Sequence, residues 1–534
     1  VPMAALALKS IQLSTFLAAA LALATPALAG DVSVKLDAGT GFSVKDSTGT
    51  VERLRVDEAT GNISRNGALF VHTTGMNNLF VGPGAGNTSS PNFENSAFGF
   101  YALSANTYGA GNSAFGFGAL RYNTGGAYNT AVGRNALRSN TTGQLNVAVG
   151  MDALGENGGG SWNSAVGVGA LRGNNGSFNV AVGHNALRSN TGFQNSAVGV
   201  DALLSNTAGT YNSAFGANAM FSNTIGDKNT ALGYGALFGN VAGSNNSAVG
   251  FLALTDNTGN RSSAFGFYAL RSNSTGQDNS AFGSSALFAN TTGYSNSALG
   301  GYALSANKSG AENAALGRDA LGNNKAGSRN IAVGFRAGFN QTTGSDNIYL
   351  ANTGVAAENT TIRIGCPAGL CPTGATPHNR AFIAGIRGVT TGAADAVTVV
   401  IDSAGQLGTV SSSREVKKDI HDMGDATARL LDLRPVTFRY KQEQTLPGGR
   451  EVPPEYGLIA EEVAQVFPDL VVYDDAGKPF TVKYHEMAPM LLNEMKKQQR
   501  TIDAQRQENQ TQQAEIASLT SRLARLEAQG VHAH

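Results

Sequence analysis

The sequence contains few charged residues, two cysteines and one tryptophan, and these scarcities already narrow the class of protein. Charged residues make up 14% of the 534 residues, whereas an ordinary soluble domain has about 25%. The 38 Lys and Arg residues balance the 38 Asp and Glu residues, so the net charge favours neither nucleic acid nor a membrane surface as a partner. With 68 glycines as well, the composition is atypical of an enzyme and of a disordered tail.

Recurring pairs of carboxylates are also missing. Asp152, Glu156, Asp201 and Asp256 are scattered, whereas a glycosidase needs an acid and a nucleophile flanking the bond that it cleaves. The single Trp162 argues further against a sugar-cleaving cleft. Four other aromatic residues of the repeat are Tyr108, Phe193, Tyr211 and Tyr294. We expect their side chains to pack in the core or the turns, and outward contact with glycans is the alternative. We expect no metal site and no cofactor.

Long apolar runs are absent except near the start of the chain. Lys9 precedes an apolar stretch from Phe16 to Ala24, and the small residues Ala27 and Ala29 fit cleavage by signal peptidase after Ala29. Residues 1–29 are therefore predicted to be a signal peptide, which places the protein outside the cell or on its surface. No other segment approaches eighteen apolar residues, so no membrane-spanning segment is expected after removal of the signal.

The two cysteines, Cys366 and Cys371, lie five residues apart in a segment rich in Pro and Gly. In an oxidising compartment such a pair favours a local disulfide. Two free thiols are the alternative, and the segment offers too few further ligands to bind a metal.

Half of the chain consists of a repeat. The phrase Asn-Ser/Thr-Ala-apolar-Gly recurs from Asn78 to Asn330 at steps of sixteen or seventeen residues, with a degenerate start at Asn347. Ala-Leu follows seven residues after each full start from Asn95 to Asn313, with one Ala-Met variant. The length varies only after Ala-Leu, where Ser, Asn, Thr and Gly mark turns that tolerate insertions.

Such a repeat predicts a solenoid of short strands rather than helices, because every unit holds two or three glycines. Seventeen extended residues would span about 56 Å, so each unit should double back as strand, turn, strand, turn. Sixteen coils would then form a rod on the order of 75 Å long. The asparagine that starts each coil predicts a ladder of stacked amides. Each coil offers only a few core candidates, such as Ala97, Phe98, Ala102 and Leu103, so we expect the rod to need partners.

These phrases resemble the head repeats of trimeric autotransporter adhesins and the repeats of some phage tail fibres. The resemblance extends from Asn78 to about Gly354 and implies a homotrimer of β-rolls or β-helices. The predicted fold class is therefore mainly β, with a β segment at 30–77, a repeat shaft at 78–350 and a β neck with the cysteine pair at 351–411. The unit is longer than the usual adhesin repeat, and no C-terminal β-barrel anchor is seen in the sequence.

Near Ser411 the repeats end and charges become dense. Four motifs follow in order: Ser412–Ile420, Leu433–Tyr440, Tyr456–Val463 and Phe467–Val471. Together they closely resemble the endosialidase-type intramolecular chaperone, a self-cleaving C-terminal domain of phage tail fibres and tailspikes. The resemblance implies a small α+β domain at 412–490.

The same resemblance implies a catalytic dyad of Ser412 and Lys417, with cleavage between Ser411 and Ser412. A serine hydroxyl is a weak nucleophile, and a lysine with a pKa lowered by burial can act as its base. A bare Ser-x4-Lys spacing has little meaning without this context. The chain departs from the family pattern at three positions that bear on the dyad: Ser413, Glu415 and Glu455.

The last segment has heptad spacing. Apolar and amide residues alternate at steps of four and three, which predicts a coiled coil at 491–527 followed by a tail at 528–534. The seam comprises Leu491, Met495, Gln498, Ile502, Gln505, Asn509, Gln512, Ile516, Leu519, Leu523 and Leu526. A lone amphipathic helix is the alternative, and the number of three strands comes from the resemblance.

The sequence thus predicts an exported homotrimeric fibre, similar to an adhesin, with a C-terminal domain that directs trimerisation and cleaves itself off as a single-turnover serine autoprotease. Its partners would be two further copies and a cell-surface glycan or host receptor. Two alternatives remain open: a phage-derived tail fibre, and a glycan-degrading tailspike.

Overall fold

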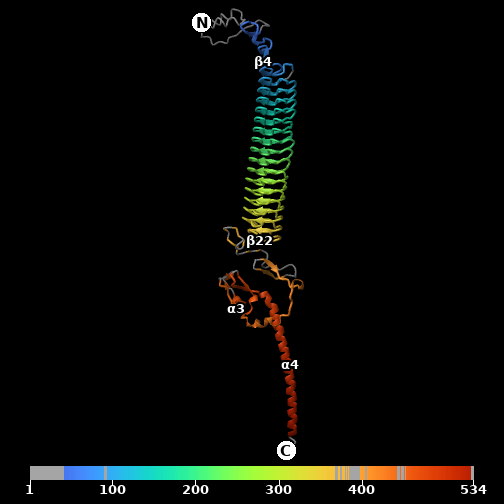
Figure 1. Cartoon of the computed structure of the whole chain (residues 1–534), viewed down its shortest axis with the longest axis vertical. Helices are drawn as coiled ribbons and strands as arrows, with labels where there is room; N and C mark the ends of the chain where they lie inside the picture. The colour runs from blue at the N-terminus through green and yellow to red at the C-terminus, as the bar shows by residue number, and fades with distance from the viewer. Residues whose placement is uncertain are drawn as a thin grey trace. The chain divides into compact units, whose positions relative to one another are not determined.

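The computed structural model describes residues 41–530 apart from 90–92, 367–370, 373, 375, 379–380, 382, 384–396, 403–405, 442–444, 447–449, 452 and 475. The predicted signal peptide lies outside the described residues. The chain divides into two units, one ending at Ile383 and the other beginning at Ala384. As predicted, the fold is mainly β, with a β-solenoid in the first unit and a small α+β region in the second (Figure 1).

Four antiparallel strands precede the solenoid: β1 (Phe42–Lys45), β2 (Glu52–Val56), β3 (Ile63–Arg65) and β4 (Ala68–His72). Strand β4 pairs with the first solenoid strand, His72 lying opposite Phe80. His72 is buried, and its Nε2 lies 2.7 Å from the carbonyl oxygen of Ala85. The antiparallel strands therefore cover the first coil and keep its edge from being a free template for another strand.

The solenoid is one parallel ladder in which each strand pairs with the strand of the next coil. Alanine lies opposite alanine at most steps, as in Ala97 and Ala114. The strands are β5 (Leu79–Val81), β6 (Ser96–Phe98), β7 (Ser113–Phe115), β8 (Thr130–Val132), β9 (Val147–Val149), β10 (Ser164–Val166), β11 (Val180–Val182), β12 (Ser196–Val198), β13 (Ser213–Phe215), β14 (Thr230–Leu232), β15 (Ser247–Val249), β16 (Ser263–Phe265), β17 (Ser280–Phe282), β18 (Ser297–Leu299), β19 (Ala314–Leu316), β20 (Ile331–Val333), β21 (Ile348–Leu350) and β22 (Ile362–Ile364).

Each full coil contains one strand of three residues, so the predicted second strand per unit is wrong. Tight turns replace it, and they use left-handed backbone at residues other than glycine, as at Asp201 (φ 55°) and Leu203 (φ 52°). Such conformations cost roughly 1 to 2 kcal/mol each. They persist because the turns also form a ladder: the Asp201 and Leu203 N–H groups donate to the carbonyls of His184 and Ala219, both at 2.9 Å.

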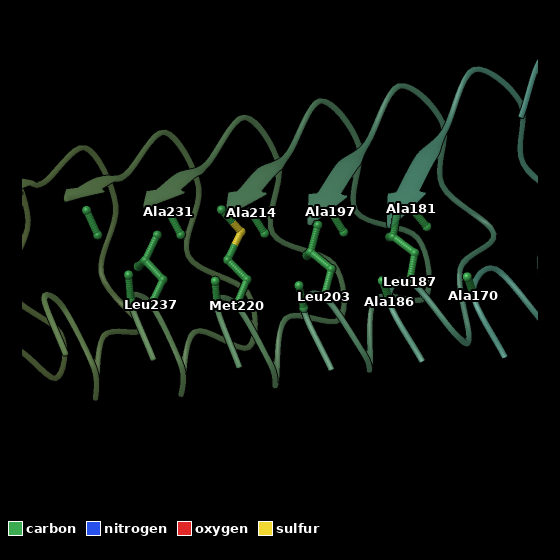
Figure 2. Close-up of a cluster of buried hydrophobic side chains, with 14 of the residues drawn as sticks. Ala170, Ala181, Ala186, Leu187, Ala197, Leu203, Ala214, Met220, Ala231 and Leu237 are labelled. Atoms are coloured by element: carbon green, nitrogen blue, oxygen red, sulfur yellow. The ribbon is translucent and has the colours of Figure 1, made fainter. Parts of the chain in front are cut away.

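The core is a column of small side chains inside the solenoid. In a typical coil Ala197, Ala202 and Leu203 are completely buried, and equivalent residues continue above and below them (Figure 2). A single chain therefore closes this core, and the need of the rod for partners stays a prediction. Phe98 was predicted to lie in the core, but it points outward and is partly exposed, because only the middle residue of each strand faces inward.

The predicted asparagine ladder is confirmed at the start of the coils. The backbone N–H of Asn212 donates to Oδ1 of Asn195 at 2.9 Å, and Nδ2 of Asn212 donates to the carbonyl of Gly226 at 2.8 Å. A second ladder, which the sequence reasoning missed, lies in the later turn of each coil, where Nδ2 of Asn223 donates to Oδ1 of Asn206 at 2.7 Å. Buried amides thus satisfy turn carbonyls that would otherwise have no partner.

The solenoid continues beyond the predicted end of the shaft at residue 350. Strand β22 pairs with β21, and Tyr349 replaces the usual alanine and fills the core of the last coils. Beyond β22 the structure contains a disulfide between Cys366 and Cys371, within the segment predicted as the neck.

The second unit combines short strands and helices. Its elements are β23 (Val399–Ile401), β24 (Leu407–Thr409), η1 (Arg414–Val416), η2 (Gly424–Asp432), β25 (Val436–Phe438), β26 (Thr445–Leu446), β27 (Arg450–Glu451), β28 (Glu455–Gly457), α3 (Ala460–Val466), η3 (Pro468–Leu470), β29 (Val471–Tyr473), β30 (Pro479–Val482) and α4 (Tyr484–Gly530). Its small core contains Val463, Leu470, Val471 and Val482, with Phe467 packed against them. None of the helices that the structure describes is both long and apolar enough to cross a membrane.

Candidate cleavage site and chaperone domain

The predicted dyad residues Ser412 and Lys417 lie on either side of the short 3-10 helix η1, and the proposed cleavage site precedes it. Ser413 caps this helix, its Oγ accepting a hydrogen bond from the Glu415 N–H at 3.3 Å. The Ser413 N–H in turn donates to Oγ of Ser411 at 3.2 Å. Ser413, one of the departures from the family pattern, therefore has a local structural role as a helix cap.

The predicted dyad is not assembled in the single chain. Ser412 and Lys417 are both exposed, and none of the hydrogen bonds described for this segment joins the Ser412 hydroxyl to the Lys417 ammonium. An exposed lysine lacks the buried surroundings that activate such a residue as a base. Glu455, in β28, is exposed as well. Ser412 and Lys417 could act together only after a change in the surroundings of this segment.

The residues of the later motifs instead form the body of the domain. Arg434, from the second motif, donates hydrogen bonds from both Nε and a terminal nitrogen to Glu462 in α3, from the third motif; the Nε bond is 3.1 Å long. This bonding lowers the pKa of Glu462 and raises that of Arg434. Both side chains are exposed, so the pair orients the two motifs more than it stabilises the fold.

The Tyr456-Gly457 motif lies close to the start of α4. Gly457, in β28, lies where an added Cβ would meet the Tyr484 hydroxyl at 2.9 Å and the Phe438 ring at 3.0 Å. That hydroxyl also accepts a hydrogen bond from the Leu458 N–H at 3.0 Å. A glycine here therefore lets β28 pack tightly against α4. His485 is exposed at the start of α4, with its Nε2 3.7 Å from Oε1 of Glu486.

A polar cluster between η2 and α4 was missed in the sequence. Thr427 is buried and donates from Oγ1 to Glu494, while Asn493 donates to Thr427 at 2.6 Å. Lys497 lies 2.9 Å from Glu494 and 3.3 Å from Asp425. Hydrogen bonds from Thr427 and Lys497 lower the pKa of Glu494. Nothing in the local sequence signals this cluster, because its partners are more than sixty residues apart.

The helix predicted to form a coiled coil is present as α4. All the seam side chains from Leu491 to Leu526 that the prediction named lie on this helix, and the large apolar ones are exposed, Met495 and Leu526 each to 64%. The polar middle of the seam, around Asn509, is exposed too. Whether α4 forms a coiled coil stays a prediction, which the exposed seam favours.

A small cavity lies beside α3. Its volume is about 250 Å³, its lining includes Leu433, Arg434, Leu458, Glu462 and Val463, and it is smaller than typical small-molecule sites. Among the described residues, no group of three or more His, Cys, Asp or Glu side chains could hold a metal ion.

Comparison with known families agrees with the motif reading at the C-terminal end. Residues 412–472 match the family described as the chaperone of endosialidase. No curated protein and no solved structure matches the chain. The matched region begins at Ser412, behind the β-solenoid, and this arrangement suggests a protein of the phage tail fibre or tailspike type.

Proposed function

We propose that this protein is an exported homotrimeric fibre in which the solenoid is the shaft and the C-terminal domain is an intramolecular chaperone. The observation that carries the proposal is the match to the chaperone family at 412–472, which follows the repeat solenoid along the chain. A solenoid supplies a long surface for binding. Its main function would be to present that surface to a cell-surface glycan or host receptor.

Trimerisation would run through α4. Its exposed apolar seam is costly to leave in water, and a heptad stripe is buried when helices of the same kind pair. Three copies agree with the trimeric fibres of the chaperone family. The polar residues near Asn509 would weaken the coil while fixing its register, since buried amides at such positions penalise shifted pairings.

Self-cleavage between Ser411 and Ser412 is the second part of the proposal. The Ser412 hydroxyl would attack the Ser411 carbonyl while Lys417 accepts its proton, and the bond from that carbonyl to the Ser412 nitrogen would break as the freed amine takes up a proton. Water would then hydrolyse the resulting ester between the Ser411 carbonyl and Oγ of Ser412, which separates the two fragments and leaves a carboxylate on Ser411. Because both side chains are exposed in one chain, we infer that assembly brings a partner surface against η1 and activates the lysine by burial. Cleavage would then report completed assembly.

Three proteins test this reaction: the wild type, Ser412→Ala and Lys417→Ala. The wild type should separate into two fragments on a denaturing gel, with a new N-terminus at Ser412, while both variants stay at full length. Lys418→Ala is the matched control and should cleave like the wild type. Three full-length bands, or cleavage in all three proteins, would remove the dyad from the proposal.

Export accords with the predicted signal peptide and with the Cys366–Cys371 disulfide, since disulfides persist in oxidising compartments. A glycan-degrading tailspike is the second candidate. The solenoid followed by the matched chaperone region suggests a tailspike as well as a tail fibre, so this candidate is also tested. Incubation of the purified protein with bacterial polysaccharides decides between the two. Sustained release of oligosaccharides would replace the structural proposal, whereas binding without products supports it.

A further inference from the structure

One face of the solenoid sheet has no covering. In each strand from β5 to β21 the middle residue faces the core, and the first and third residues face outward. The third residue is Val, Phe or Leu in all seventeen strands, from Val81 to Leu350. We call this row the sheet stripe. Its members are partly exposed, as at Phe115 (41%), Val166 (42%) and Leu299 (53%).

The stripe is not an ordinary solvent-facing sheet surface. Parallel sheets are almost always covered on both faces, and a soluble single chain rarely exposes more than a few hundred Å² of continuous apolar surface. The neighbouring outward row, formed by the first residue of each strand, carries Ser, Thr, Ala, Val, Ile or Leu and no charge. Charged pairs of the solenoid lie elsewhere, in the turns, as at Arg261–Asp278 and Arg329–Asp346.

The aromatic members indicate what kind of partner fits. Phe98 stacks on Phe115 with ring centroids 4.9 Å apart, and Phe265 stacks on Phe282 at 4.8 Å, both pairs within 4° of parallel. Residues of successive coils cover the faces of these rings, so the outward surface consists of ring edges and aliphatic groups. Sugars stack on ring faces, which are covered here. The surface therefore suits an apolar protein partner better than a glycan.

We propose that the sheet stripe is the surface on which copies of this chain pack lengthwise, each stripe facing the common axis of the oligomer. The inference rests on the proposed homotrimer and adds the face through which the shafts meet. A second copy of the chain carries the same stripe, with the same length, the same spacing between coils and no charged residue in the stripe. The stripe presents seventeen outward apolar side chains, a surface of the same order as the roughly 800 Å² that a standard interface buries on each partner.

Cysteine placement tests the face in the full-length protein. Val166→Cys and Leu299→Cys put a thiol in the stripe, and Ser189→Cys puts one at an exposed turn position outside it. The two native cysteines form a disulfide and leave no other thiol to react. A short bis-maleimide should join chains in both stripe variants, up to about two thirds of them in a trimer, since one linker joins two of three chains. It should join few chains in Ser189→Cys.

Native mass and circular dichroism accompany the cross-linking and separate the two proposals. A native trimer with unchanged circular dichroism and no cross-links at either stripe position would overturn the stripe as the contact face and leave the trimer intact. The same conclusion would follow if Ser189→Cys alone were joined. A native mass of one chain would overturn the proposed trimer and this inference together.

Discussion

Between Phe80 and Tyr349 the solenoid buries a continuous column of Ala and Leu within one chain, whereas the C-terminal unit buries few apolar side chains and leaves the seam of α4 in solvent. In the solenoid, each coil supplies hydrogen-bond and packing partners to the coil beside it. The C-terminal unit depends on contacts that one chain does not provide. The solenoid is therefore complete as a folding unit except on its sheet stripe, while the C-terminal unit is incomplete along a helix.

The largest effect should come from blocking the stacking of coils. Gly199 has φ 137°, and an added Cβ would lie 2.6 Å from the backbone of Gly216. Gly199→Val should destabilise the solenoid by roughly 4 kcal/mol, because it combines backbone strain with a collision that no side chain can relieve. Gly125→Ala, where nothing lies within 4 Å of the added Cβ, is the control. Thermal unfolding followed by circular dichroism measures both, and equal midpoints would contradict the stacking account.

The next-largest effect concerns the dependence of the C-terminal unit on partner chains. Leu519→Lys in α4 should leave the fold of the single chain unchanged, since Leu519 is already exposed, and should weaken association by about 3 kcal/mol through an uncompensated charge in the seam. Sedimentation velocity across a concentration series measures the shift towards single chains. Ser518→Lys, outside the seam, should sediment like the wild type; if both variants stay trimeric, α4 does not hold the copies together.

A smaller effect should distinguish buried from exposed amides within one turn. Asn174 is buried and makes four side-chain hydrogen bonds, to Asn157, Gly176, Asn179 and Asn190. The next residue, Asn175, is exposed, and its side chain accepts one hydrogen bond, from the Gly158 N–H. Asn174→Ala should therefore destabilise the solenoid by about 2 kcal/mol, because it leaves buried polar groups unpaired.

The matched variant Asn175→Ala should lose less than about 0.5 kcal/mol, as expected of one exposed hydrogen bond. Chemical denaturation gives both values. Equal losses would mean that the ladder contributes to the shape of the coils and little to their stability.

The smallest effect concerns exposed ion pairs along the turns. Hydrogen bonding from Arg329, 2.6 Å away, lowers the pKa of Asp346. A carboxyl with a lowered pKa in the folded protein stabilises it above the pKa of the unfolded chain, about 3.9, and this contribution is lost as the pH falls through the lower folded value. Asp346→Asn should remove that part of the acid dependence: it should lower stability slightly near pH 7, where the ionised carboxyl contributes, and leave stability unchanged at the acid end, where the wild type has already lost the contribution. Unfolding midpoints of the two proteins between pH 2 and 7 check this, and identical acid profiles would contradict it.

Repetition made the solenoid and its first amide ladder predictable. The spacing of the Asn starts marked each coil of the solenoid, because each unit sees the same neighbours as the next. The second ladder, at residues such as Asn206 and Asn223, was missed because asparagine in a turn segment looks the same whether buried or exposed. The left-handed Leu203 was missed for a similar reason: leucine disfavours this backbone by itself, and only hydrogen bonding between coils holds it there.

The candidate site divides in the same way. Its motifs predicted the domain, and the chaperone family match confirms it. The sequence also named Ser412 and Lys417, but the single chain leaves both exposed, and their joint action stays a prediction. The Thr427–Glu494 contact could not be predicted, because it joins residues 67 positions apart without a motif.

The sequence by itself determined the repeat, the order of the regions and the heptad stripe of α4, because periodic patterns encode which residues share a face. Only the tertiary structure decided that each coil has a single strand, that the narrow core closes within one chain, and that the row from Val81 to Leu350 faces outward. The physical reason is that burial depends on what lies in the adjacent coil. A strand of three residues can turn one apolar side chain inward and must leave the next outside.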